Sequence, residues 1–160
     1  MDVNIAMRPE AVVLARFENN VSPNSFKVQI LERLSEIFSE VYNLNAADIL
    51  DGLQQREVLG STGFGQGVAI PHCRNAAVKR PSMALLKLEN PCDFQSADAV
   101  PVTLVFGLVS PENAGASHLH ALAAISRLLR DEAMLQALFG ADDAEALFAL
   151  LTNQFLRDAA

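Results

Sequence analysis

The most reactive part of this sequence is a glycine-rich run that ends in a histidine. From Arg56 to His72 the chain reads REVLGSTGFGQGVAIPH, with four glycines among the eight residues 60–67. Glycine lets the backbone adopt positive φ and approach a ligand closely, so its amides can point at an anion. A neutral imidazole is nucleophilic at physiological pH and can accept a phosphoryl group. The run therefore predicts a nucleophilic His72 at a sheet edge, facing backbone donors.

The same run holds groups that would balance the charge of a bound phosphate. Arg56 is permanently charged, and hydroxyl and amide groups of the loop can donate hydrogen bonds. The loop residues expected to bind phosphate are Ser61, Thr62, Gly63, Gly65 and Gly67. A purely structural glycine turn before a lone histidine is the alternative. An ATP or NAD site is not expected, because the run lacks a Gly-Lys-Ser/Thr ending and leads into a strand candidate instead of a helix.

The other two histidines, His118 and His120, lie within the segment SHLH. On the helix expected there, residues two apart point about 200° from each other, so the two rings do not bind one metal ion together. His118 shares a face with Leu122, Ile125 and Leu129, whereas His120 shares one with Ala124, Arg127 and Asp131. We expect His118 at the start of the buried stripe, near a helix N-terminus that favours phosphate, or else as a partly buried capping residue. His120 is expected at the surface.

Composition argues against several classes of partner. The formal net charge is −7 and no cluster of Lys or Arg is present, so neither nucleic acid nor an anionic membrane surface is expected. No apolar segment is long enough to span a bilayer and no signal peptide is visible, so a cytoplasmic location is expected. Cys73 and Cys92 are expected to be free thiols, although a disulfide stays open.

Two helices are expected ahead of the glycine-rich run. The first begins at residues 22–25, where Ser and Asn can cap a first turn, and its apolar positions recur at spacings of four and three. Its expected buried face is Phe26, Ile30, Leu34, Ile37 and Val41. The second is capped by Asn45 and ends near Arg56 or Glu57. The opening stretch, to about Asn20, gives no clear prediction.

The rest of the chain mixes strands and helices. The expected strands are residues 68–70, which Pro71 stops, then 83–88 and 102–109. Residues 102–109 are apolar on both faces, which is typical of a strand covered by helices on each side. The expected helices are about 117–130, about 132–140, and one that starts at Asp142 with Glu145 completing a capping box. This mixture predicts an α/β sandwich with a central sheet between helices.

The run from Arg56 to His72 and the later His-Leu-His element together resemble a known family. The pattern Arg-Glu-x-x-Gly-Ser-Thr-Gly-x-Gly-x-Gly-x-Ala-Ile-Pro-His resembles the enzyme IIA domains of the mannitol–fructose class of the bacterial phosphotransferase system (PTS), the EIIA type-2 domains. It is most similar to their nitrogen-regulatory branch. The resemblance covers about residues 10–155 and implies one domain over residues 1–160, with a mixed β-sheet sandwiched between helices.

The resemblance also implies roles for residues. In this family the histidine of Ile-Pro-His, here His72, accepts a phosphoryl group from an HPr-like carrier, and a tele-phosphohistidine is expected. The residues beside the phosphate correspond to Arg56 and His118, and neither a metal nor another cofactor is implied. Two positions depart from the family. Gln66 stands where sugar-transporting members often carry Glu, and Cys73 stands where Gly is usual.

The resemblance leaves three functions to compare. A regulatory phosphocarrier that controls cytoplasmic target proteins through its phosphorylation state is the favoured one. A fructose- or mannitol-specific IIA subunit that passes phosphate to a IIB domain is the first alternative, and a binding module of the same fold without phosphotransfer is the second. An apolar ring of Phe64, Val68 and Ile70 around His72 is the expected docking surface for the carrier.

Overall fold

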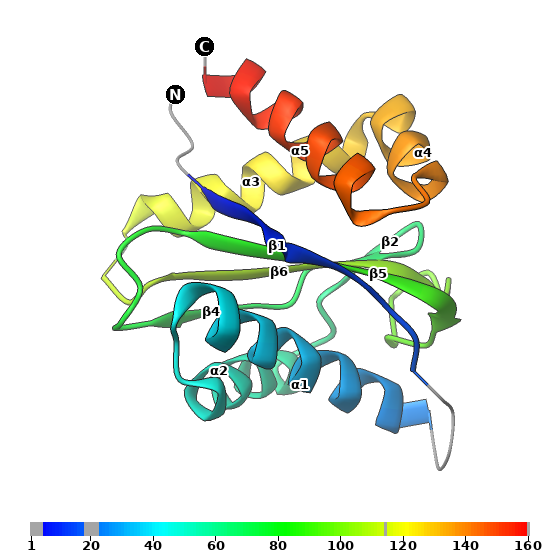
Figure 1. The fold of residues 1–160 in the computed structure, drawn as a ribbon. Helices are drawn as coiled ribbons and strands as arrows, with labels where there is room; N and C mark the ends of the chain where they lie inside the picture. Colours follow the sequence, from blue (N-terminus) through cyan, green and yellow to red (C-terminus); the bar gives the residue numbers. More distant parts are fainter. Residues whose placement is uncertain (1–4, 18–22, 114, 160) are drawn as a thin grey trace.

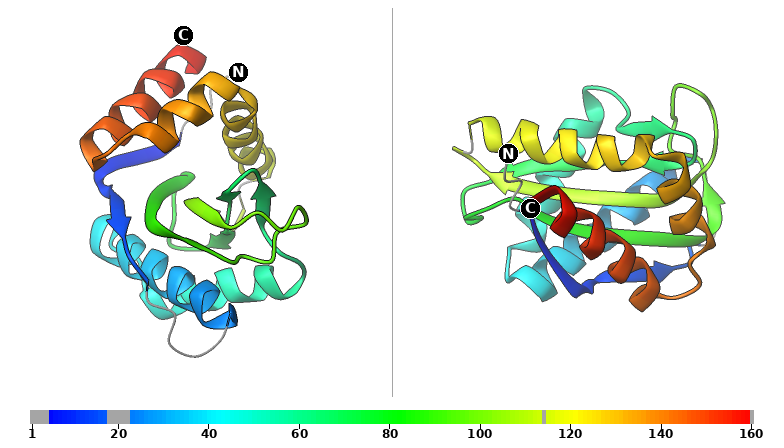
Figure 2. Two further views of the ribbon diagram at one scale, coloured as in Figure 1. Left: turned by 90° about the vertical axis from the view of Figure 1, so that its right-hand side faces the viewer. Right: turned by 90° about the horizontal axis from the view of Figure 1, so that it is seen from above.

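A mixed sheet of six strands lies between two layers of helices in the computed structural model, which describes residues 5–17, 23–113 and 115–159 (Figure 1). The elements are, in chain order, β1 (Ala6–Ala15), α1 (Pro23–Tyr42), α2 (Ala46–Val58), β2 (Gly63–Gly65), β3 (Val68–Ala69), β4 (His72–Asn75), β5 (Ser82–Cys92), β6 (Val102–Pro111), α3 (Ala116–Arg130), α4 (Glu132–Gly140) and α5 (Ala144–Ala159). Helices α1 and α2 cover one face of the sheet, and α3, α4 and α5 cover the other (Figures 1 and 2). The predicted α/β fold class is confirmed.

On one side of β6 the sheet is interrupted, because two short strands, β3 and β4, pair there instead of one long strand. The strand order is β1-β5-β6-β3-β2, and β4 also pairs with β6. β5 and β6 are antiparallel, β1 is parallel to β5, and both β3 and β4 are parallel to β6. Ile70 and Pro71 separate β3 from β4, and the Pro71 carbonyl accepts the Leu108 amide (3.0 Å). His72 is thereby fixed as the first residue of β4, opposite Leu108.

The sheet has a separate hydrophobic core on each face. Along β6, Val105 and Val109 pack with α1 and α2, whereas Phe106 and Leu108 pack with α3, α4 and α5. All four side chains are fully buried. Because successive residues of a strand point to opposite faces, a strand covered on both sides must be apolar throughout, as this one was predicted to be.

The two predicted helices before the glycine-rich run are confirmed where they are described. On α1 the predicted apolar face is buried from Phe26 to Ile37 and Val41 is half-buried, while Ser22 lies outside the described residues. Asn45 caps α2 as expected, since its side chain accepts the Asp48 amide at 3.0 Å. The helix runs one residue past Glu57, to Val58. Its last turn therefore carries Arg56 to the edge of the sheet.

Other predictions about elements need correction. Three strands were missed: β1, whose apolar pattern is broken by the exposed residues 8–10, and the short strands β2 and β4, which depend on pairing more than on their own sequence. The last helix is capped by Asp143, which accepts the Ala146 amide at 2.8 Å, so the predicted capping box at Asp142 is wrong. Ala124, assigned to the solvent side of α3, is buried. Cys73 and Cys92 are both free and buried, as expected.

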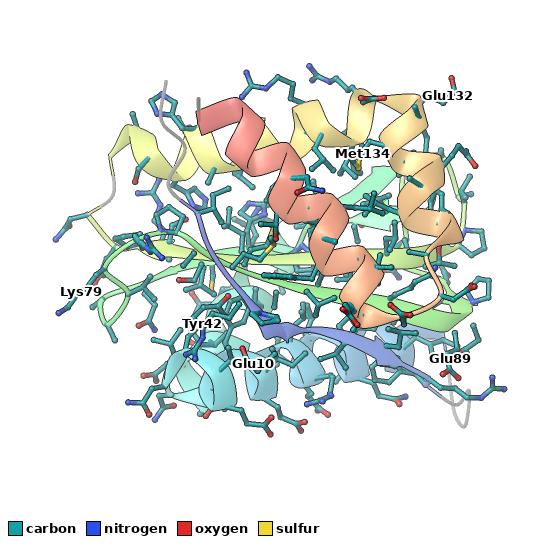
Figure 3. The ribbon with its side chains drawn as sticks, turned by 45° about the horizontal axis from the view of Figure 1, so that its top comes forward. Glu10, Tyr42, Lys79, Glu89, Glu132 and Met134 are labelled. Carbon is teal, nitrogen blue, oxygen red and sulfur yellow. The ribbon has the colours of Figure 1, made fainter. Side chains whose placement is uncertain are left out.

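Tyr42 fastens the end of α1 to the sheet. Its hydroxyl donates to the Met83 carbonyl of β5 (2.7 Å) and accepts the backbone amide of Arg8 in β1 (3.3 Å). Figure 3 shows Tyr42 close to the same stretch of β1 as Glu10. Burial raises the pKa of Tyr42 to about 12, so the hydroxyl keeps the proton that it donates.

Among the described helices, none combines the length and apolar character needed to cross a membrane.

Gly107 marks the place where α1 comes closest to β6. A Cβ atom at this position would lie 2.9 Å from Cδ2 of Leu34 and 3.1 Å from Cε2 of Phe38, both of which are fully buried. We expect Gly107→Ala to lower the free energy of unfolding by about 1–3 kcal/mol through overpacking. Gly140→Ala is the control, because no atom lies within 4 Å of its added Cβ. Urea denaturation of both variants tests the prediction, and equal stabilities would contradict it.

Candidate functional site

Three residues that the sequence singled out come together from three different elements. Arg56 lies in the last turn of α2, His72 begins β4, and His118 lies in the first turn of α3. The Arg56 Nε–H donates to Nε2 of His72 at 3.2 Å. The two imidazole rings lie 5.5 Å apart between centroids, tilted by 48°. A guanidinium and a second imidazole thus flank the ring of His72.

The hydrogen bonds of His72 define its tautomer. Its Nδ1 lies 2.8 Å from the carbonyl oxygen of Ile70, and a carbonyl can only accept, so Nδ1 carries the ring proton. Nε2 therefore holds the lone pair of the neutral ring. The pKa of His72 is lowered, mainly by burial and further by the charge of Arg56, while the Ile70 hydrogen bond and Glu57 oppose that shift. The ring is a neutral nucleophile near neutral pH.

His118 is buried, with 6% of its surface exposed, and its Nδ1 lies 2.6 Å from the hydroxyl oxygen of Ser110. The position before α3 is Gly115, which makes no side-chain capping bond, so His118 does not cap the helix. Burial lowers its pKa to about 4, and the neighbouring His72 and Arg74 contribute in the same direction. His118 is therefore a neutral ring that can exchange hydrogen bonds. His120 is exposed, as predicted.

Glu57, the residue after Arg56, anchors the start of the glycine-rich loop. Its carboxylate accepts the backbone amide (2.9 Å) and the hydroxyl (2.6 Å) of Thr62. The same carboxylate forms an ion pair with Nζ of Lys27 at 3.0 Å, and both side chains are largely buried. Arg56 in turn donates from Nη1 to the Gly60 carbonyl at 2.9 Å. Glu57 thus holds the start of the loop, and its neighbour Arg56 contacts both the loop and His72.

Two of the five predicted phosphate ligands of the loop, Ser61 and Thr62, have other hydrogen-bond partners in this structure, and so does the Gly63 amide. The Ser61 hydroxyl donates to the Phe94 carbonyl (2.8 Å) and accepts the Gly63 amide (3.1 Å), and both donors of Thr62 are bound by Glu57. A Cβ atom added at Gly63 or Gly65 would meet Ser96 or Asp98 of the β5–β6 connection, and one added at Gly67 would meet Phe139 of α4 and the Pro101 carbonyl. Arg56 and His118 are the groups placed beside His72, and phosphate binding by the loop stays a prediction.

The expected apolar docking ring around His72 is largely wrong. Val68 and Ile70 are buried in the core below β3, because this short strand is covered from both sides. Phe64 is 36% exposed, but among the residues whose burial is described the most exposed large apolar side chains are Val58 (85%), Leu59 (83%) and Leu119 (63%). They directly follow Arg56–Glu57 and His118 in the chain. The position of these apolar residues, directly after Arg56–Glu57 and His118, was the sequence signal that could have identified this exposed surface.

Cys73 points away from the reactive ring. It packs against α2, where a Cβ added at Gly52 would lie 3.0 Å from its Cβ and 3.1 Å from its Sγ. Burial raises its pKa to about 12, so this thiol stays protonated and poorly nucleophilic. The cysteine beside His72 is therefore a packing residue. Among the described residues, no group of three or more His, Cys, Asp or Glu side chains is placed to hold a metal ion.

The fold and this cluster define a class of protein. It is an α/β sandwich in which His72, at the sheet edge, lies beside a guanidinium and a second imidazole, both of which can donate hydrogen bonds to an anion. Residues 16–154 match the family model described as "Phosphoenolpyruvate-dependent sugar phosphotransferase system, EIIA 2". The chain therefore belongs to the EIIA type-2 family of the phosphotransferase system.

Similar proteins place the chain within that family. It is 39% identical to a "Nitrogen regulatory protein" of Bradyrhizobium diazoefficiens over 151 residues, which cover 94% of this chain and 95% of the relative. It is also 39% identical to the protein of the same description from Pseudomonas aeruginosa, over 82% of this chain and 86% of that one. The crystal structure of nitrogen regulatory protein IIA-Ntr from Neisseria meningitidis matches with a TM-score of 0.79 and 34% identity, covering 91% of this chain and 95% of the other.

Proposed function

We propose that this protein carries a phosphoryl group on Nε2 of His72 and works as a regulatory phosphocarrier of the phosphotransferase system. An HPr-like phosphocarrier is the donor, and cytoplasmic target proteins respond to the phosphorylation state. The observation that carries the proposal is the hydrogen bond from Nδ1 of His72 to the Ile70 carbonyl. It leaves the lone pair on Nε2, beside the guanidinium of Arg56.

The transfer step follows from this geometry. The lone pair of Nε2 attacks the phosphorus of the donor phosphohistidine and forms a new N–P bond. The donor N–P bond breaks, its electron pair stays on the donor nitrogen, and that ring regains a proton from solvent. Arg56 exchanges its hydrogen bond to Nε2 for one to the phosphoryl oxygens, where a charge-assisted bond stabilises the developing charge. The Ile70 carbonyl keeps the proton on Nδ1, which leaves the new N–P bond labile.

The regulatory role is favoured over sugar transport by the identity to nitrogen regulatory proteins. Phosphorylation adds about −2 charge, which is a strong local change beside a docking surface. Val58, Leu59 and Leu119 provide exposed apolar area next to Arg56 and His118. A partner that docks on this area meets a neutral ring in one state and a dianion in the other. The sugar-specific alternative requires onward transfer to a IIB domain.

Phosphorylation of the full chain with phosphoenolpyruvate, enzyme I and an HPr-type carrier tests the proposal. We expect one acid-labile phosphoryl group per chain, detected by intact-protein mass spectrometry and placed on Nε2 of His72 by ¹⁵N and ³¹P NMR. A phosphoryl group on another residue, on Nδ1, or none at all would overturn the assignment. Adding a fructose- or mannitol-type IIB domain separates the two roles, because rapid loss of the label to IIB supports the sugar-specific subunit.

A further inference from the structure

Ser110 is the residue that contacts His118 from the sheet, and no sequence signal pointed to it. It lies near the end of β6 and is fully buried, with 0% of its surface exposed. In the parallel pairing of β4 with β6, Leu108 lies opposite His72 and Ser110 lies opposite Arg74. Since Leu108 faces the α3 side of the sheet, Ser110 two residues later faces the same side. The pairing of β4 with β6 thus fixes the position of Ser110 relative to His72.

The burial of Ser110 decides which way its hydrogen bond runs. Its Oγ lies 2.6 Å from Nδ1 of His118, which is the partner observed for this hydroxyl within the described part of the chain. If Nδ1 carried the ring proton, the hydroxyl proton would be a buried donor without an acceptor, which is unfavourable. The hydroxyl therefore donates to Nδ1. A neutral ring that accepts at Nδ1 carries its proton on Nε2.

We propose that Ser110 is a positioning residue for phosphoryl transfer, whose hydroxyl holds His118 as the Nε2–H tautomer so that this ring donates a hydrogen bond to the phosphoryl group on His72. The proposal rests on the proposed function of His72. Nδ1 of His118 is bound to Ser110, whereas no hydrogen-bond partner of its Nε2 is observed among the described residues. With its proton there, His118 adds a neutral donor beside His72, whose ring centroid lies 5.5 Å away.

A hydroxyl suits this task better than the usual partners of histidine. A carbonyl or carboxylate can only accept, so it would draw the proton to Nδ1 and leave a lone pair facing the phosphoryl oxygens. A hydroxyl donates to the neutral ring, and it can rotate and accept if the negative charge of the arriving phosphoryl group leads that ring to take up a proton from solvent. The charged and titratable groups that act on His118 are His72 and Arg74, both on β4. Both disfavour protonation before the phosphoryl group arrives.

The tautomer of His118 can be measured in the unphosphorylated full-length protein by ¹⁵N NMR of the histidine rings. We expect the Nε2–H form in the wild type and in Ser110→Thr, which keeps the hydroxyl, and a mixture of both forms in Ser110→Ala. Transfer from the phosphorylated HPr-type carrier should slow about tenfold in Ser110→Ala and stay within about twofold in Ser110→Thr. His120→Gln removes the surface signal and serves as the control for assignment.

Wild-type His118 with its proton on Nδ1, or Ser110→Ala with an unchanged tautomer and transfer rate, would overturn the role of Ser110. The wild-type spectrum decides even if Ser110→Ala does not fold. The tautomer is read without any phosphoryl donor, so this inference and the proposed function can fail separately. An Nε2–H tautomer in a protein that is never phosphorylated on His72 would leave the Ser110–His118 assignment standing and overturn the proposed function, together with the role in transfer that rests on it.

Discussion

Replacing His72 by glutamine is expected to abolish phosphorylation while leaving the fold intact. The glutamine side chain offers an amide that can donate to the Ile70 carbonyl and a carbonyl that can accept from Arg56, so the polar contacts of the site are retained. It has no nucleophilic nitrogen, because an amide nitrogen has no basic lone pair. The pairing of β4 with β6 uses the backbone and is unaffected. We expect no phosphoryl incorporation and a loss of stability of less than about 1 kcal/mol.

Two matched substitutions serve as comparisons for the His72→Gln result. His120→Gln changes an exposed histidine of α3 and is expected to be phosphorylated at the wild-type rate. His118→Gln removes the second imidazole and is expected to slow transfer by about 10²-fold without abolishing it, because the nucleophile remains. Incorporation is followed by mass spectrometry under single-turnover conditions. A phosphoryl group on the His72→Gln variant would show that another residue is the acceptor.

The sequence predicted the central parts of the fold because their signals are local. The stripe of α1, the Asn45 cap of α2 and the doubly apolar β6 depend on periodicity and capping within one element. The strands β2 and β4 were missed because they have only 3 and 4 residues. β2 pairs with the nearby β3, whereas β4 acquires its conformation by pairing with the distant β6. Pairing partners 30 or more residues away leave no local pattern. Because β4 was missed, the place of His72 as its first residue was missed as well.

For the same reason, the sequence predicted some residues of the site and missed others. Arg56 and His118 were predicted from residue chemistry and helical spacing and again from the family pattern, and the structure places both beside His72. Ser110 was missed because a single serine at the end of an apolar strand has no motif, and its contact with His118 depends on how α3 packs on the sheet. Reactive residues can be read from chemistry and spacing. The residues that orient them require the tertiary structure.

Glu57 is where the stability of the fold and the geometry of the site depend on one side chain. We expect Glu57→Ala to lower the free energy of unfolding by about 3–5 kcal/mol, because it leaves Lys27 buried without its counter-ion. It also leaves the amide and hydroxyl of Thr62 without their acceptor. Glu57→Gln should cost less, because its carbonyl can still accept one of the two Thr62 donors. Urea denaturation at constant pH measures all of these variants.

Glu36 supplies the control, since its ion pair with Arg33 at 3.3 Å is on the surface of α1. Solvent screens that pair, so Glu36→Gln is expected to change stability by less than about 1 kcal/mol. A similar small change in Glu57→Ala would show that the buried pair contributes little. Because Arg56 binds both the Gly60 carbonyl and His72, loosening the loop at Thr62 should also slow phosphoryl transfer in Glu57→Gln, although Glu57 touches neither imidazole directly. Slower transfer with the nucleophile in place is the expected result of loosening the loop whose Gly60 carbonyl binds Arg56.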